Sequence, residues 1–163
     1  MAIDAYLKID GINGESEDEK HKQWIEVSNV LYSINQPRAE TVSTAGGLTT
    51  GRAEFYPITF RKLADIASPV LLQTCAAGKT IPKAVFEFMR ADGNGTPIPY
   101  FKIELENLMI ANITPDSGEG GIISERVHLA YSKIKWSYTR QSIRGGTQGN
   151  TSGGWDCAAN KVC

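Results

Sequence analysis

Apolar and polar residues alternate with a period of two along most of the chain, and this pattern predicts β-strands. Successive side chains of a strand point to opposite faces, so alternation marks strands with one buried face. We expect strands at residues 6–10, 24–36, 52–60, 84–92, 100–114 and 124–142. The Asp92-Gly93-Asn94-Gly95 stretch predicts a hairpin between two of them. The chain is therefore expected to be mainly β.

In three of these strands the apolar positions change faces part-way along, near Ser28, Asn107 and Lys133. In the strand that contains Asn107, for example, apolar residues stand at odd positions up to Leu105 and at even positions from Leu108. A slip of one residue sends every later side chain to the other face, so each strand should bulge or bend there. Strands of this kind join two sheets at corners. We therefore predict a small antiparallel β-barrel of two joined sheets.

One α-helix is predicted beside the barrel. Ser68 fits the N-cap, Pro69 fits the first helical position, and Gly78 can adopt the left-handed conformation that ends a helix. The aromatic residues expected to fill the barrel interior are Phe55, Phe86, Phe88, Trp136 and Tyr138.

Two segments lack the strand pattern. Residues 37–51 contain three glycines and little periodicity, and an extended loop of this length is typical of partner binding. Residues 143–163 are rich in glycine, and we expect a C-terminal tail that Trp155 anchors against the barrel.

Length and charge narrow the class of protein. The 163 residues predict a single domain over residues 1–163. With 17 Lys and Arg against 18 Asp and Glu, the net charge is −1, which argues against nucleic acid as a partner. The N-terminus lacks the basic and apolar regions of a signal peptide, and no apolar stretch is long enough for membrane insertion.

The sequence contains few residues with a catalytic or metal-binding pattern. No Cys-x-x-Cys pair accompanies the two histidines, His21 and His128, so we expect no metal and no cofactor. Neither histidine has an evident nucleophile nearby in the sequence, so we expect no catalytic residues and no enzyme. Two alternatives stay open: a hydrolase that uses His21 or His128, and a monomeric lipocalin-like ligand-binding β-barrel.

An ordered set of segments over essentially the whole chain resembles the Hcp family, the tube-forming proteins of bacterial type VI secretion. The segments that carry the resemblance are Met1-Ala2-Ile3-Asp4-Ala5-Tyr6-Leu7-Lys8-Ile9, Gly14-Glu15-Ser16, His21, Ile34-Asn35-Gln36, residues 41–51, Phe60-Arg61-Lys62-Leu63-Ala64-Asp65, Ala67-Ser68-Pro69-Val70-Leu71-Leu72, Cys75, Gly78-Lys79, Glu104-Leu105-Glu106-Asn107, Ile110, Glu125-Arg126-Val127 and Gly154-Trp155-Asp156.

This resemblance implies a structural protein that forms homohexameric rings. The rings would stack into a hollow tube inside contractile sheath proteins, below a VgrG-type spike, with small effector proteins in the lumen. The protein would assemble in the bacterial cytoplasm and then be secreted or delivered into target cells without a signal peptide.

Such a role implies two kinds of site. For contacts between subunits or rings we expect the 37–51 loop to contribute Thr41, Val42, Ser43, Thr44, Leu48 and Thr49. For the lumen face we expect the side of the 24–36 strand that faces away from the core, namely Asn29, Leu31, Ser33 and Asn35.

Overall fold

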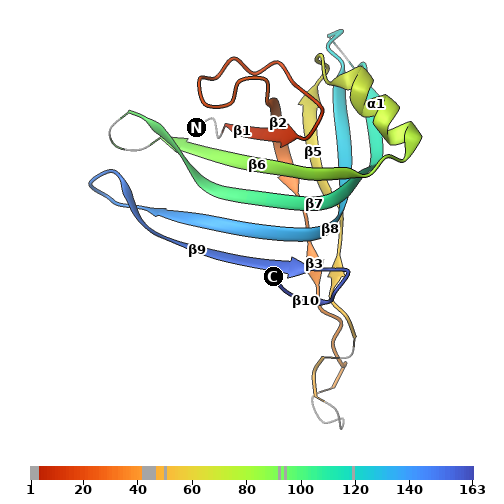
Figure 1. The fold of residues 1–163 in the computed structure, drawn as a ribbon, viewed down its shortest axis with the longest axis vertical. Helices are drawn as coiled ribbons and strands as arrows, with labels where there is room; N and C mark the ends of the chain where they lie inside the picture. Colours follow the sequence, from red (N-terminus) through yellow and green to blue (C-terminus); the bar gives the residue numbers. More distant parts are fainter. Residues whose placement is uncertain (1–3, 42–46, 50, 92, 94, 119) are drawn as a thin grey trace.

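The computed structural model describes residues 4–41, 47–49, 51–91, 93, 95–118 and 120–163, and it is mainly β (Figure 1). In chain order the elements are β1 (Ala5–Ile9), β2 (Ile25–Leu31), β3 (Ile34–Asn35), β4 (Glu54–Phe55), β5 (Ile58–Leu63), α1 (Ser68–Ala77), β6 (Ile81–Ala91), β7 (Pro97–Asp116), β8 (Ser124–Gln141), β9 (Thr147–Asp156) and β10 (Lys161–Val162). Among the described residues, no helix has the length and apolar character needed to cross a membrane.

Six of the strands form a closed barrel, as the sequence predicts. The strands run in the order β8, β5, β2, β1, β6 and β7, all neighbours are antiparallel, and β7 pairs with β8 to close the ring. β9 pairs with β8 outside this ring, and β10 pairs with β9. Closure gives each barrel strand two neighbours and so removes the free edges of an open sheet.

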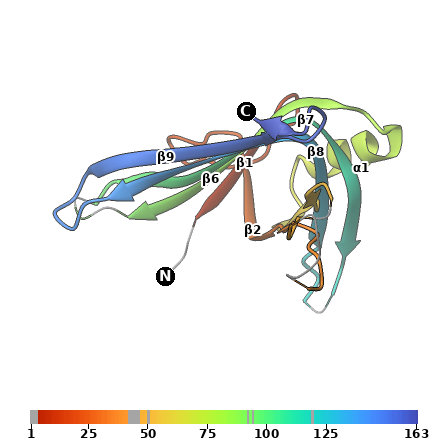
Figure 2. The same ribbon diagram turned by 90° about the horizontal axis from the view of Figure 1, so that it is seen from below.

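β7 and β8 change faces opposite one another and form the corner between two sheets. Buried positions shift from Leu105 to Leu108 in β7 and from Leu129 to Ile134 in β8. At the corner, Asn107 has a φ of 49°, and the Ser132 hydroxyl donates to its carbonyl oxygen at 2.9 Å. Figure 2 shows both strands turning there. The face changes predicted near Asn107 and Lys133 are confirmed.

The partners of β8 change at the same corner. Residues 124–129 of β8 pair with β5, whereas residues 133–141 pair with β9. The third predicted change of face is confirmed in β2, where the register against β5 shifts between Ser28 and Leu31 and Asn29 has a φ of 50°. A bulge of this kind turns the later side chains of β2 to the other face.

The barrel interior is filled with side chains. Phe60 and Phe86 are almost fully buried, and their rings meet edge to face with centroids 5.7 Å apart. α1 covers one end of the barrel and contributes Leu71 to the same core cluster. Trp136 packs half-buried against this cluster, as expected, but Tyr138 is 41% exposed and its predicted place in the core is wrong. Beyond the corner, β8 lies between β7 and β9 and no longer pairs with β5, and Tyr138 lies toward the far end of this part.

The start of α1 differs from the prediction. Ser68 lies inside the helix, and Ala67 occupies the N-cap without a side-chain hydrogen bond. The Ser68 hydroxyl instead accepts from the Asp65 backbone N–H at 2.9 Å and from the Lys62 ammonium at 3.0 Å. The predicted helix end is confirmed, because Gly78 adopts the left-handed conformation at a φ of 61°.

A buried ion cluster joins β5, β8 and the start of α1. Lys62 Nζ lies 2.6 Å from Glu125 Oε2 and 2.8 Å from Asp65 Oδ1. The side chains of Lys62 and Glu125 are 0% and 2% exposed. One ammonium group therefore holds β8 against the segment that joins β5 to α1.

Most of the glycine-rich C-terminal tail expected over residues 143–163 forms strands, which the sequence pattern did not predict. Its Thr, Ser, Asn and Gly residues form β9, because the free edge of β8 beyond the corner supplies hydrogen-bond partners along its length. The predicted anchor is confirmed, because Trp155 packs against the core cluster of the barrel. Its ring also stacks on Phe55 of β4, with centroids 6.4 Å apart and an interplanar angle of 15°.

A narrow β-ribbon extends from the barrel where the sequence predicts a loop. The strand expected over 24–36 divides into β2 and β3, the strand expected over 52–60 divides into β4 and β5, and β3 pairs with β4. The pairing continues beyond these strands, since Arg38 bridges to Thr49 and the Ala39 N–H donates to the Leu48 carbonyl at 2.8 Å. We call β3, β4 and the described residues between them the ribbon; it projects away from the barrel (Figure 1).

Candidate functional site

The outer face of β2, β5, β7 and β8 carries polar and charged residues because the other side of each strand faces the core. In β5, Phe60 is buried while Arg61 is exposed. In β8, Val127 is buried while Arg126 is exposed and His128 is half-buried. The alternation predicted from the sequence therefore places the charges of two adjacent strands on one surface.

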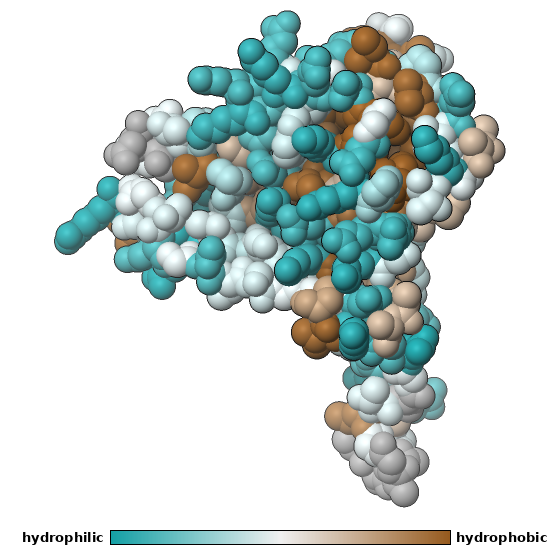
Figure 3. Space-filling view, in the orientation of Figure 1, coloured by the Kyte–Doolittle hydropathy of each residue, from teal (hydrophilic) through white to brown (hydrophobic). Residues whose placement is uncertain are grey.

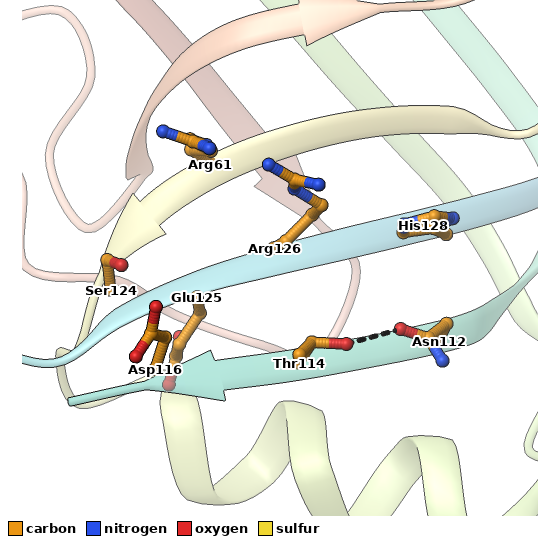
Figure 4. A pocket seen from close by; sticks show the side chains of 8 residues that line it. All are labelled: Arg61, Asn112, Thr114, Asp116, Ser124, Glu125, Arg126 and His128. Atoms are coloured by element: carbon orange, nitrogen blue, oxygen red, sulfur yellow. Dashed lines mark hydrogen bonds between the residues drawn. The ribbon is translucent and has the colours of Figure 1, made fainter. Parts of the chain in front are cut away.

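This surface is hollowed into two adjoining cavities of about 570 and 480 Å³. Arg61, Arg126 and His128 line both of them. We call the combined surface the groove, and its outward-facing residues are Asn29, Leu31, Arg61, Asn112, Thr114, Asp116, Arg126 and His128. Figure 4 shows the larger hollow, with side chains from β5, β7 and β8.

The centre of the groove is a pair of like charges. Arg61 in β5 stands directly opposite Arg126 in β8, and Thr59 stands opposite His128. On the other side of β8, His128 stands opposite Asn112, whose Oδ1 accepts from the Thr114 hydroxyl at 2.8 Å. The groove therefore combines two guanidinium groups with neutral amide and hydroxyl groups.

The structure separates the four residues predicted to form a lumen face. Asn29 and Leu31 line the groove, and Leu31 is 68% exposed. Ser33 and Asn35 are also exposed but lie on the ribbon, where the Asn35 amide donates to Glu54 Oε2 at 3.2 Å. The break after β2 causes this separation. Sequence reasoning missed the two arginines, although the alternation in β5 and β8 could have placed them on the same side as Asn29.

Three of the residues predicted for contacts between subunits are described, and they lie on the ribbon. Thr41, Leu48 and Thr49 are exposed, with Leu48 at 54%. Val42, Ser43 and Thr44 lie outside the described residues.

His21 is a buried structural residue. It is 1% exposed, its ring stacks on Tyr6 at 4.3 Å, and its two nitrogens lie 2.6 Å from Asp18 Oδ2 and 2.7 Å from Glu87 Oε2. The imidazole thus links the loop between β1 and β2 to β6. A side chain enclosed in this way does not reach a substrate, so His21 does not support the hydrolase alternative.

The contact between Asp18 and His21 predicts a loss of stability in acid. The hydrogen bond from the His21 side chain is the largest cause that lowers the pKa of Asp18 below its ordinary value of 3.8. A lowered pKa means that the ionised carboxylate stabilises the folded state above the unfolded pKa, and that this contribution disappears as the pH falls through the folded pKa. We expect Asp18→Asn to lower the urea midpoint at neutral pH.

The difference between wild type and Asp18→Asn is expected to shrink as the pH falls below 3.8 and through the lowered pKa of the folded Asp18, because the carboxyl is then protonated and its contribution disappears. Glu17→Gln is the matched control, since Glu17 is exposed and neighbours Asp18 in the sequence. A difference that stays constant from neutral to acid pH would contradict the role of the charged carboxylate.

The fold and the groove define a class before any relative is considered: a closed β-barrel with a packed interior, an open polar groove on its outer face and a projecting ribbon, suited to binding or assembly. The sequence model of the family described as "Type VI secretion system effector, Hcp" matches residues 6–138. The chain therefore belongs to the Hcp family of type VI secretion proteins.

Known relatives cover nearly the whole chain. Protein hcp1 of Pseudomonas aeruginosa is 27% identical over 162 residues, which is 98% of each chain. A solved structure of a type six secretion system protein has a TM-score of 0.92, with 27% identity over 99% of this chain and all of that one. Hcp1 from Salmonella typhimurium has a TM-score of 0.78, with 36% identity over the full length of both chains.

Proposed function

We propose that this chain is a structural subunit of a type VI secretion tube, which forms homohexameric rings that stack into a hollow cylinder. The observation that carries the proposal is the agreement of the whole chain with the structures of a type six secretion system protein and of Hcp1 from Salmonella typhimurium. A ring made of one chain needs two dissimilar surfaces that recognise each other. The polar groove and the apolar surface around α1 at one end of the barrel are two dissimilar surfaces of this kind.

Exposed apolar residues support assembly with further copies of the chain. Leu63, Ile66 and Val70 are 61%, 63% and 43% exposed around the start of α1, and Ile122 in the loop after β7 is 65% exposed. Figure 3 shows apolar surface over and beside α1. Grouped apolar residues on a protein surface typically mark an interface.

The ribbon is proposed to contact the neighbouring ring or subunit. It extends beyond the barrel, and its described residues Leu48 and Thr49 are exposed (Figure 1). Paired backbone groups along its length make it stiff enough to hold a contact at a distance from the barrel.

We assign the lumen face to the groove and to the exposed residues that follow it on the ribbon. Asn29 and Leu31 lie in the groove, and Ser33 and Asn35 lie on the ribbon. Effector proteins would pass along this wall, while a VgrG-type spike and contractile sheath proteins would contact the assembled tube. The chain would act without catalysis, in the cytoplasm during assembly and outside the cell after export.

A lipocalin-like function is disfavoured by the packing of the interior. A ligand-binding barrel needs an internal cavity, whereas Phe60, Phe86 and Ile103 fill the centre of this barrel and are all at most 1% exposed.

Gel filtration coupled to light scattering tests the proposal. We expect a species of six times the 17.8 kDa subunit mass, and electron micrographs with ring-shaped particles. Leu48→Asp is expected to leave the rings intact and to reduce their stacking into tubes, because it places a charge at the ribbon contact. Ile143→Asp, which alters an exposed apolar residue outside the ribbon, is the control. A 17.8 kDa monomer at all concentrations would refute the ring.

A further inference from the structure

Two arginines in the groove face each other without a compensating charge. Arg61 and Arg126 occupy directly opposite positions of β5 and β8. Side chains in such positions start about 4.5–5.5 Å apart, and like charges there destabilise a sheet. Within the described part of the chain, neither guanidinium makes a hydrogen bond or ion pair that would offset this repulsion.

Lys62, the residue next to Arg61, carries a charge that stabilises the fold. Lys62 points inward and lies within 2.8 Å of two carboxylates, whereas Arg61 points outward and has none. Two acidic residues line the larger hollow: Glu125, which is buried and paired with Lys62, and Asp116, whose carboxylate accepts from the Gly118 N–H at 3.0 Å. Figure 4 shows Asp116 apart from the two arginines. The ten N–H donors of the pair are therefore open to a ligand.

We propose that Arg61 and Arg126 bind the carboxylates of an acidic segment in a passenger protein, a specificity that rests on the proposed role of the groove as the lumen wall. Two guanidinium groups on adjacent strands suit carboxylates because each can form paired, charge-assisted hydrogen bonds. A bound acidic segment also removes the repulsion between the two arginines.

The surroundings of the pair favour a polypeptide. The hollows of about 570 and 480 Å³ lie on both sides of the arginines, so an extended segment fits across them. Leu31, which is 68% exposed, offers an apolar contact to a peptide side chain. Asn29 and Asn112 offer amide groups to a peptide backbone. A phosphate group would use the charges and leave these neighbours without a role.

The exposure of both arginines sets the strength of binding. Ion pairs at an open surface are weak and are screened by salt, so each ring would hold an acidic segment reversibly. Repetition of the site around a ring and along a stack of rings would raise the overall affinity without a strong individual contact.

The experiment measures fluorescence anisotropy of labelled hexaglutamate on the intact chain at low and physiological salt. We expect Arg61→Gln/Arg126→Gln to weaken binding about tenfold, since two charge-assisted contacts are lost. Arg140→Gln/Arg144→Gln is the matched control, because it removes the same charge from two exposed arginines at the far end of β8 and in the turn that follows. Equal binding by the two double variants would overturn the proposal.

Two further probes identify the ligand chemistry. Arg61→Glu/Arg126→Glu is expected not to bind hexaglutamate and to bind labelled hexalysine, whereas we expect the wild type not to bind hexalysine. A single-stranded hexathymidine that binds the wild type more tightly than hexaglutamate, in an arginine-dependent way, would overturn the proposal in favour of a phosphate ligand.

Light scattering on the same samples separates this inference from the proposed function. Rings that do not bind hexaglutamate would overturn the carboxylate site and leave the tube subunit in place. A monomer that binds hexaglutamate through the two arginines would support the carboxylate site and refute the ring.

Discussion

Lys62→Met is expected to lower the free energy of unfolding by about 3–5 kcal/mol, because it leaves a buried carboxylate without its counter-charge. Glu125 is 2% exposed on its side chain, and Lys62 Nζ is its partner at 2.6 Å. Methionine has a similar length but supplies no N–H donor. The change also removes the ammonium donor from Asp65 and Ser68 at the start of α1.

Urea unfolding followed by tryptophan fluorescence measures this effect, at one fixed protein concentration because assembly adds to apparent stability. Lys135→Met is the control for loss of a lysine, since Lys135 is exposed on β8, and we expect a change within about 0.5 kcal/mol. Lys62→Met/Glu125→Leu should recover most of the loss, because it removes both buried charges together. If Lys62→Met is as stable as Lys135→Met, the buried ion cluster does not stabilise the fold.

Gly14→Ala is expected to destabilise the protein by about 3 kcal/mol through a clash with the backbone. A Cβ at Gly14 would lie 2.5 Å from the Trp24 carbonyl oxygen and 2.8 Å from Ile25 Cα. Neither atom can move easily, because Ile25 begins β2 and the Gly14 N–H donates to the Gln23 carbonyl at 2.7 Å. The methyl group would therefore separate the loop after β1 from the start of β2.

Gly153→Ala is the matched control for this substitution. Gly153 lies in β9, and a Cβ there would meet no atom within 4 Å. We expect its urea midpoint to stay close to the wild-type value, since surface substitutions away from special features change stability by no more than about 0.5 kcal/mol. Equal destabilisation by both variants would mean that loss of glycine flexibility, and not the close approach at Gly14, is responsible.

The alternation of residues predicted the strands well where one side of a strand is buried. The changes of face near Ser28, Asn107 and Lys133 were readable because a buried apolar residue cannot change face without a slip in the backbone. β9 was missed because its Thr, Ser, Asn and Gly residues have no apolar side to bury. It forms because β8 extends beyond the barrel and leaves an edge to be paired. The exposure of Tyr138 was also not predicted, because Tyr138 lies in the part of β8 that pairs with β9.

The candidate site was only partly predictable. Asn29 and Leu31 follow from the outward side of β2, which alternation defines. The opposition of Arg61 and Arg126 depends on a register between strands that lie more than sixty residues apart, and no local pattern specifies that register. Pairing within one hairpin is set by its turn, whereas pairing between distant strands is set by how the whole core packs.

The sequence by itself determined a mainly β chain, the positions where strands change face and the end of the helix. Its ordered segments also indicated membership of the Hcp family. Each of these depends on neighbouring residues or on their periodicity along one strand. Only the tertiary structure decided that β1 pairs with β6, that β5 pairs with β8 to complete the barrel, and that two arginines meet in one groove. Those features depend on contacts between distant segments, whose geometry arises when the core packs and each exposed edge finds a partner.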